Sequence, residues 1–251
     1  MNKALLLCGL LLLGTAGVAS AAGLQFHWNA CNAAGTQDNT FPCDDDAAVF
    51  DIMGQFQMPA ALVGVTGVEF TVDLAAASPS LPAWWQFNVG ECRDSQMNIL
   101  EGTPLASACP DWAANGASGG LAAYNEGTLG PNTAHILGGF AVPAAKAKNL
   151  TGTPNYFAFK VDLSTVGTVA APVCAGCNIP VCIVFNGIKV VVPPVAGQPD
   201  GSVKISNPAS PGSNFVTWQG GAGVGSLLGQ GCPAETPTHK STWGAVKSLY
   251  R

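Results

Sequence analysis

Two stretches of period-two alternation constrain the fold more than any other feature of the sequence. In residues 68–74 (VEFTVDL), Val, Phe, Val and Leu alternate with Glu, Thr and Asp, and residues 157–163 (FAFKVDL) repeat the alternation. Because successive side chains of a strand point to opposite faces, each segment predicts a half-buried strand with its apolar face inward. Such strands must pair into sheets whose apolar faces are covered.

Shorter apolar runs, separated by Gly and Pro, predict further strands. Helical evidence is thin: Pro143 opens one or two predicted turns over residues 143–150. Many short strands with hardly a helix indicate an all-β protein: an antiparallel two-sheet sandwich, jelly-roll or immunoglobulin-like, with long disulfide-tied loops. The other predicted strands are residues 24–28, 49–57, 84–88, 135–142, 181–192 and 214–218.

The N-terminus has the order of a secretory signal peptide: Lys3, an apolar run over residues 4–13, then small residues. The apolar run is shorter than the roughly 20 residues that cross a bilayer as a helix. We expect cleavage near Ala21 and a secreted, extracellular or cell-surface protein of bacterial type without a transmembrane segment. The expected organisation is a signal peptide at 1–21, one sandwich domain with a flexible Gly-rich end at 22–231, and a linker with a C-terminal tail at 232–251.

Charged residues make up only 10% of the chain. Removal of Lys3 with the signal peptide reduces the ten basic residues to nine, against fifteen acidic ones. A mildly acidic chain with scattered lysines lacks the basic patch that nucleic-acid binding needs, and it lacks the basic cluster of a membrane-surface binder. Neither partner is expected.

The sequence has nine cysteines, and cleavage near Ala21 removes Cys8. Eight cysteines in an exported protein predict four disulfides. Proximity in the sequence favours Cys31 with Cys43 and Cys92 with Cys109. The other four allow Cys174–Cys177 with Cys182–Cys232, or Cys174–Cys182 with Cys177–Cys232.

Residues 174–182, CAGCNIPVC, contain the C-x-x-C spacing found in zinc sites and redox enzymes. No second C-x-x-C or His pair completes a zinc set, and Pro180 with a predicted strand follows Cys177 in place of a helix. In an oxidising compartment the segment is better interpreted as a disulfide-stapled loop. No cofactor is expected.

The order VTGVEFTVDL, AHILGGFAVPAAKAKNLTGTPNYFAFKVDL and PVCIVFNGIKVVVP resembles the cohesin-like family of β-sandwiches, which is related in fold to several carbohydrate-binding modules. The resemblance covers residues 60–194 and is one of pattern. It implies a cohesin-like or carbohydrate-binding-module-like sandwich that serves as a binding or structural scaffold. It assigns no functional residue.

Residues 90–130 are predicted to form long loops, where function usually resides. Within them GASGG, residues 116–120, matches the G-x-S-x-G of hydrolases but lacks the preceding buried strand that holds such a serine. The acids of this region show no spacing that singles out a catalytic pair, so a hydrolase is the least favoured function. These acids are Glu91, Asp94, Glu101, Asp111 and Glu126.

Tryptophans are the candidate ligand-binding residues. If residues 84–88 form a strand, Trp84 and Trp85 point to opposite faces, so one can lie on the surface while the other joins the core. An exposed indole is suited to stacking on a sugar ring. Trp112 is a further candidate, and packing under a sheet edge or loop is the competing interpretation.

Asp44, Asp45 and Asp46 concentrate oxygen atoms of the kind that calcium prefers. The alternating spacing of a calcium loop is absent, and consecutive side chains cannot all converge on one ion. A solvated acidic turn is therefore favoured, and no metal is expected.

These features together favour a secreted, non-catalytic binding module for carbohydrate or a cell-surface glycan. Its expected partner is a polysaccharide, a surface glycan or another surface protein. The alternative is a structural or adhesive surface protein attached or sorted through residues 232–251, where Trp243, Val246 and Leu249 lie three residues apart on one predicted helical face.

Overall fold

The computed structural model describes residues 22–32, 35–102, 109–114, 116, 119–194 and 199–221. Within these residues the chain forms strands β1 to β13 and two short 3-10 helices, η2 (Ala83–Trp85) and η3 (Ala144–Lys146). This content confirms the predicted all-β class. No helix in the described part is long and apolar enough to cross a membrane.

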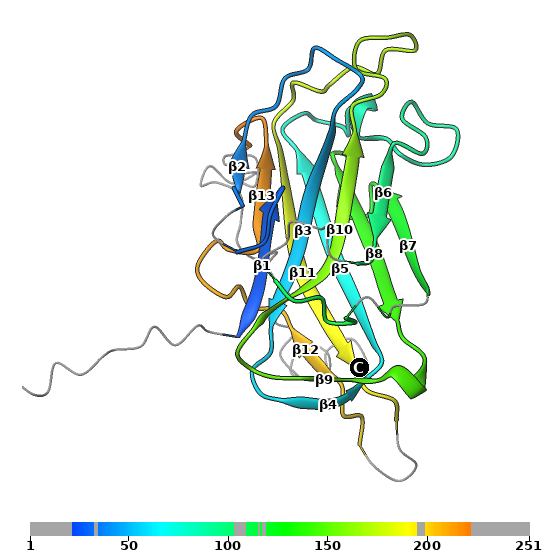
Figure 1. Cartoon of the computed structure of the whole chain (residues 1–251). Helices are drawn as coiled ribbons and strands as arrows, with labels where there is room; N and C mark the ends of the chain where they lie inside the picture. Colours follow the sequence, from blue (N-terminus) through cyan, green and yellow to red (C-terminus); the bar gives the residue numbers. More distant parts are fainter. Residues whose placement is uncertain are drawn as a thin grey trace, which may run out of the picture.

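Two sheets face each other across the core (Figure 1). The first has four strands in the order β1-β3-β10-β6, and the second has seven, with β2-β13-β11-β5-β8-β7 in order and β12 beside β11. A small pair, β4 (Leu62–Val65) with β9 (Lys148–Leu150), lies apart from both. The four-stranded sheet contains β1 (Gly23–Trp28), β3 (Val49–Gln57), β10 (Asn155–Ser164) and β6 (Met97–Leu100). The seven-stranded sheet contains β2 (Asp38–Asn39), β13 (Phe215–Trp218), β11 (Val181–Val191), β5 (Gly67–Ala76), β8 (Thr133–Ala141), β7 (Gly119–Glu126) and β12 (Val203–Ile205).

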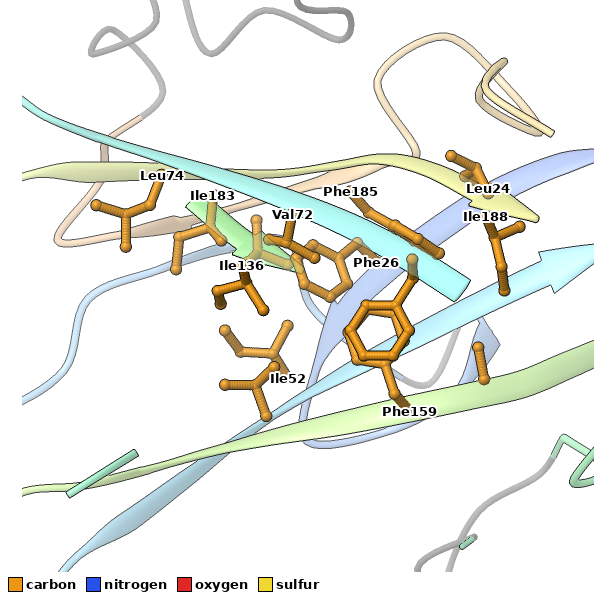
Figure 2. Close-up of a cluster of buried hydrophobic side chains, with 14 of the residues drawn as sticks. Leu24, Phe26, Ile52, Val72, Leu74, Ile136, Phe159, Ile183, Phe185 and Ile188 are labelled. Atoms are coloured by element: carbon orange, nitrogen blue, oxygen red, sulfur yellow. The ribbon is translucent and has the colours of Figure 1, made fainter. Parts of the chain in front are cut away.

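The inward side chains of both sheets form one aromatic-rich core, and Figure 2 shows them meeting between the ribbons. Phe70 of β5 stacks on Phe159 of β10 with ring centroids 3.8 Å apart, and Phe185 of β11 meets Phe159 edge-on at 5.1 Å. Gly54 lies opposite Phe159 in the ladder, where a Cβ would collide with the phenyl ring. The absence of a side chain at Gly54 therefore makes room for the stacked pair.

The alternation in residues 68–74 is confirmed, because Val68, Phe70, Val72 and Leu74 are all buried in this core. In residues 157–163 the alternation breaks at one position. A bulge between Phe157 and Phe159 turns Phe157 to the other face of the four-stranded sheet, where it packs with Met53 and two cysteines. An extra residue in one strand shifts the period by one, which sequence periodicity alone does not reveal.

Most predicted strands are present, but the strand predicted at residues 84–88 is wrong: this segment contains the 3-10 turn η2. The predicted turns at residues 143–150 shrink to η3, followed by strand β9. Within the predicted long loops of residues 90–130, two strands form, β6 and β7.

The predicted pairs Cys31–Cys43 and Cys92–Cys109 are wrong, and so is each partner predicted for Cys174 and Cys177, although the described cysteines are all disulfide-bonded. The bridges join Cys31 to Cys109, Cys43 to Cys177 and Cys92 to Cys174, over sequence separations of 78, 134 and 82 residues. Cys182 is also disulfide-bonded, and its predicted partner Cys232 lies outside the described residues. Sequence proximity failed because the sandwich brings loops from distant strands together at its ends.

Candidate functional site

The three tryptophans predicted to contact a ligand are buried. Trp84 and Trp85 are 0% exposed and Trp112 is 2% exposed. The 3-10 turn does not alternate side chains between two faces as a strand does, so both indoles of the Trp84–Trp85 pair turn inward. None of the three offers the exposed face that stacking on a sugar requires.

Arg93 and Thr168 hold Trp84 in place. The indole Nε1–H of Trp84 donates to Thr168 Oγ1 at 2.9 Å, and the Arg93 guanidinium lies 3.5 Å from the centroid of the ring. The Arg93 Nη1 atom also donates to the Trp84 carbonyl at 2.8 Å. Burial lowers the pKa of Arg93 to about 9, while the nearby negative charge of Asp46 acts in the opposite direction. This cluster supports the fold and does not open to solvent.

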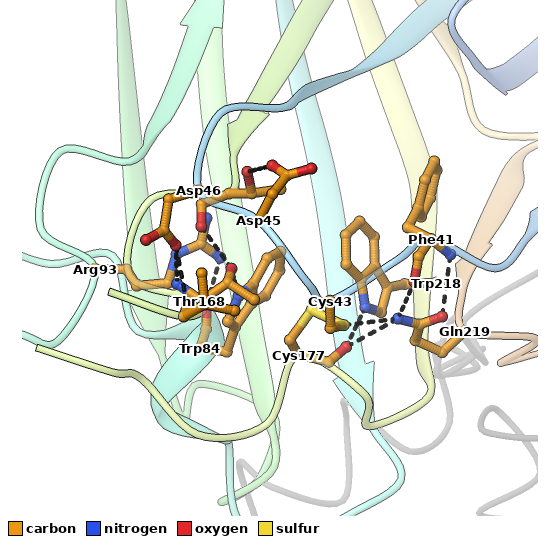
Figure 3. Close-up of a disulfide and its surroundings, with 12 residues drawn as sticks. Phe41, Cys43, Asp45, Asp46, Trp84, Arg93, Thr168, Cys177, Trp218 and Gln219 are labelled. Atoms are coloured by element: carbon orange, nitrogen blue, oxygen red, sulfur yellow. Dashed lines mark hydrogen bonds between the residues drawn. A yellow bond between two sulfur atoms is a disulfide. The ribbon is translucent and has the colours of Figure 1, made fainter. Parts of the chain in front are cut away.

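The acidic turn also has a structural role, shown in Figure 3. The carboxylate of Asp46 accepts backbone N–H bonds from Thr168, Val169 and Ala170 at 2.7–3.0 Å, which lower its pKa. The Asp45 carboxylate caps the N–H groups of Ala47 and Ala48. Asp44 is exposed. In the described part of the chain no three acidic, His or Cys side chains gather as metal ligands would. The Asp46 carboxylate anchors the β10–β11 loop, and the Asp45 carboxylate caps its own turn.

A polar cluster lies on the outer face of the four-stranded sheet. Asn155 Nδ2 approaches the side-chain oxygens of Gln25, Asn32 and Gln55 at 2.7–3.0 Å, and Gln55 Nε2 lies 3.1 Å from His27 Nδ1. Gln55 is fully buried, and burial lowers the pKa of His27 below its ordinary value of 6.5. Gln25, Asn32 and Asn155 are half-buried, and their side chains are used in the hydrogen bonds of this cluster.

The buried His27 predicts a loss of stability in acid. Because its pKa is lower in the folded state, the unfolded chain takes up a proton first as the pH falls below about 6.5. The protonation of His27 therefore leaves the free energy of unfolding unchanged above that pH. Between that pH and the lower pKa of the folded state, the free energy of unfolding decreases as the pH falls. Thermal melts of wild type and His27→Asn at pH 7.5 to 4.5 should show a smaller acid-dependent decrease in the variant. Parallel curves would contradict the prediction.

Among the described residues, a hollow of about 1290 Å³ opens to solvent on the outer face of the seven-stranded sheet, formed by β5, β7, β8, β11 and β12. Its β7–β8 side consists of small and aliphatic residues, among them Leu121, Leu137 and Gly139. Leu121 is 86% exposed and Leu137 is 48% exposed. Phe70 and Phe140 also border the hollow but are buried, so they present no ring for stacking. We call this surface the outer-face hollow.

Charges border the hollow on its β11–β12 side. Lys189 of β11 lies opposite Lys204 of β12 and beside Glu69 of β5. Asp200 forms an ion pair with Lys189 at 3.6 Å, but it is mostly exposed. The hollow therefore combines an aliphatic side with a side that carries two adjacent lysines.

One further polar group lies on the same outer face. Asp73 of β5 accepts hydrogen bonds from the His135 imidazole of β8 and from the Asn186 amide of β11. An aspartate–histidine pair can orient an imidazole for base catalysis when a nucleophile lies beside it. Among the described residues, no hydroxyl or thiol forms a hydrogen bond with His135. The arrangement therefore cross-links the three strands β5, β8 and β11.

The remaining catalytic candidates do not converge on this hollow. Asp94 accepts bonds from Gly90 N–H and Ser95 Oγ in its own turn, and Asp111 caps Ala113 N–H. Partial burial raises the pKa of Glu126, and the charge of Glu91 raises it further. Neither of these two acids lines the hollow. Ser118 of the G-x-S-x-G match lies outside the described residues.

Sequence reasoning missed the hollow because its floor is made of residues that carry little signal. The paired glycines Gly119–Gly120 and Gly138–Gly139 lie on adjacent strands, with Gly120 opposite Phe140 and Gly139 opposite Leu121. A Cβ at Gly139 would lie 2.9 Å from the Val68 carbonyl. The available signal of a close backbone approach was the glycine pair Gly138–Gly139 inside the predicted strand 135–142.

Comparison with known proteins gives little beyond this geometry. No protein-family model matches the chain, and no curated protein matches it in sequence. A solved structure to which it is similar is the second type II cohesin module from the cellulosomal adaptor ScaA scaffoldin of Acetivibrio cellulolyticus. The two share 7% identity over 79% of this chain and 90% of that chain, with a TM-score of 0.31. The cohesin family is also the one that residues 60–194 resemble in pattern.

Proposed function

We propose that this protein is an exported, non-catalytic binding module that holds a protein partner in its outer-face hollow. The hollow itself carries the proposal. At about 1290 Å³ it exceeds the usual size of a small-molecule pocket, which is about 300–1,000 Å³, and it is open along the sheet. A surface of this size suits a segment of a folded partner better than a small ligand.

The lining supports a protein partner over a glycan. Leu121 and Leu137 supply exposed aliphatic surface, while the candidate tryptophans are buried. Sugar recognition by stacking needs an exposed aromatic face, and apolar contact with a rim of charges is the common pattern of protein interfaces. Lys189 and Lys204 on the β11–β12 side favour a partner with acidic residues next to its apolar ones.

Export is supported by the cysteines. All seven described cysteines are disulfide-bonded, a state that persists in oxidising compartments. Together with the signal-peptide order of residues 1–21, this supports a location outside the cytoplasm. Attachment or sorting through residues 232–251 stays a prediction, since that segment lies outside the described residues.

A capture experiment tests the proposed function. The mature protein is immobilised and offered envelope and secreted proteins of the source organism, and separately insoluble cellulose, xylan and chitin. Leu137→Asp should reduce capture of the retained protein at least tenfold, because a carboxylate would lie on the aliphatic side of the hollow. Val173→Asp, at a valine that is 58% exposed and does not line the hollow, is the matched control.

Equal capture by Leu137→Asp and wild type would contradict a role for the hollow. Retention on a polysaccharide, without capture of a protein, would return the function to glycan binding. Absence of any retained protein would reject the proposal.

A further inference from the structure

The strand β7 ends the seven-stranded sheet (Figure 1), and no other described strand pairs with its outer edge. Gly127 N–H donates to the Thr133 carbonyl at 2.8 Å, in the same register that pairs Asn125 with His135 and Ala123 with Leu137. Hydrogen-bonded pairs alternate along antiparallel strands, so the odd-numbered residues of β7 bond to β8. The even-numbered residues direct their N–H and C=O groups away from it.

Four residues therefore present unpaired backbone at this edge: Gly120, Ala122, Tyr124 and Glu126. None of them has a backbone hydrogen bond on that side to another described residue. Six of the eight residues of β7 are exposed, and its sequence, GGLAAYNE, has no proline or lysine and a single charge at its end. Edge strands that remain solvated usually carry such charges, prolines or bulges, because an open edge pairs readily with another strand.

The other sheet edges are covered or short. Along β1, the N–H groups of Leu24, Phe26 and Trp28 donate to the carbonyls of Asn207, Ser213 and Thr36 at 2.7–2.9 Å. The edge strand β6 has four residues and β2 has two. Among the described strands, β7 is thus the long one with an open edge.

We propose that β7 is a dimerisation strand that pairs antiparallel with β7 of a second copy of this chain. A second copy is favoured because a two-fold axis pairs the open edge with itself and leaves none exposed. Pairing of β7 with the opposite edge of the sheet would continue into a fibre, but that edge ends in the two-residue strand β2. The symmetric arrangement closes after two copies.

The alternation of the backbone groups fixes the register. Residues whose backbone groups face away from β8 must lie opposite the same kind of residue in the second copy. The register that uses all four such residues places the two-fold axis at Ala123. Ala122 then pairs with Tyr124 of the second copy, and Gly120 pairs with Glu126 of the second copy. Each pair exchanges two hydrogen bonds, about eight in total. In this register the two Glu126 carboxylates lie at opposite ends of the joined strands.

The dimer would place two hollows on one continuous face. Residues 119–123 of β7 line the hollow. The two-fold axis at Ala123 is perpendicular to the joined sheet, so the outer faces of both copies point to the same side. The exposed Leu121 would lie opposite Asn125 of the second copy. Two linked sites raise the avidity for a partner that carries repeated segments.

The first test removes one outward N–H. Ala122→Pro deletes a donor that faces away from β8, a position where an edge strand tolerates proline. In sedimentation velocity and light scattering on the full mature chain, wild type should have the mass of a dimer at submillimolar concentration, and Ala122→Pro that of a monomer. Ala122→Ser keeps the N–H and should stay dimeric. A monomeric wild type, or a dimeric proline variant, would overturn the proposal.

A second test reads the register and does not depend on the proline variant folding. Opposite residues in a non-hydrogen-bonded pair have Cα atoms about 4.5 Å apart, within disulfide range. Ala123→Cys should therefore form a covalent dimer on a non-reducing gel. Asn125→Cys, which faces Leu121 of the second copy, should not. Equal cross-linking of both variants, or of neither, would overturn the register.

Dimerisation and partner capture can fail separately. Leu137→Asp alters the hollow on β8 and leaves the outward backbone groups of β7 intact, so it should keep the dimer mass. Ala122→Pro alters the edge and should still capture the partner, with a faster release where the partner is multivalent.

Discussion

Trp218→Ala should lower the free energy of unfolding by about 3–5 kcal/mol, which is the usual cost of deleting a buried tryptophan. Trp218 is 0% exposed, and its ring centroid lies 4.5 Å from that of Phe41 and 4.7 Å from that of Trp84. Rigid aromatic rings on several sides cannot collapse into the space that the indole leaves. The Cys177 carbonyl, which accepts the Nε1–H at 2.6 Å, would also lose its donor.

Urea unfolding followed by tryptophan fluorescence and by circular dichroism measures this loss, with the slope of the transition checked for two-state behaviour. Trp218→Phe keeps an aromatic ring but loses the hydrogen bond, so its loss should be smaller. Val89→Ala, at a side chain that is 93% exposed, should change stability very little. A loss under about 1 kcal/mol for Trp218→Ala would mean that the pocket around it relaxes.

The architecture could be predicted where side-chain burial follows a simple period. Strands β3, β5 and β11 match their predicted ranges within a few residues. In residues 68–74 of β5 the polar and apolar residues alternate without interruption, because one face packs in the core and the other lines the outer surface. Period-two alternation is a direct record of that environment.

Strand β7 shows where this reasoning fails. Its sequence, GGLAAYNE, contains no β-branched residue and a single aromatic one, Tyr124, so it carries little of the composition that marks strands. The strand forms because β8 offers it a ladder and because the missing side chain of Gly120 lets the Phe140 ring lie across it. Both causes are tertiary, so the local sequence does not contain them.

The prediction of an exposed tryptophan failed for a related reason. Whether Trp84 and Trp85 diverge or both turn inward depends on one local choice between a strand and a 3-10 turn. That choice is set by contacts with distant residues, including the Arg93 guanidinium and the Thr168 hydroxyl. The hollow could not be predicted either, since it requires knowing that β7 and β8 lie side by side.

Removal of the Cys43–Cys177 bridge, by Cys43→Ser with Cys177→Ser, should cost about 3–4 kcal/mol of stability. The bridge spans 134 residues, but the bridges Cys31–Cys109 and Cys92–Cys174 shorten the loop that it closes. The path from 43 to 31, from 109 to 92 and from 174 to 177 is about 32 residues long, and chain-entropy arguments give a few kcal/mol for such a loop. Urea unfolding under non-reducing conditions measures the loss, and a change of less than about 1 kcal/mol would contradict it.

The losses of stability from Trp218→Ala and from removal of the Cys43–Cys177 bridge should not be additive. The backbone of Cys177 accepts the Trp218 Nε1–H bond and a second bond from Gln219 Nε2 at 3.2 Å, so the bridge and the indole support the same loop (Figure 3). Once the bridge is gone, that loop can relax around the space left by Trp218→Ala, and the combined loss should be at least about 0.5 kcal/mol smaller than the sum. The Cys31–Cys109 bridge packs with Met53 and Phe157 on the other face of the four-stranded sheet. The loss of stability from removing Cys31–Cys109 should therefore add to the loss from Trp218→Ala within error. Equal coupling of Trp218→Ala to both bridges would contradict the idea that the coupling arises from the contact between Trp218 and Cys177.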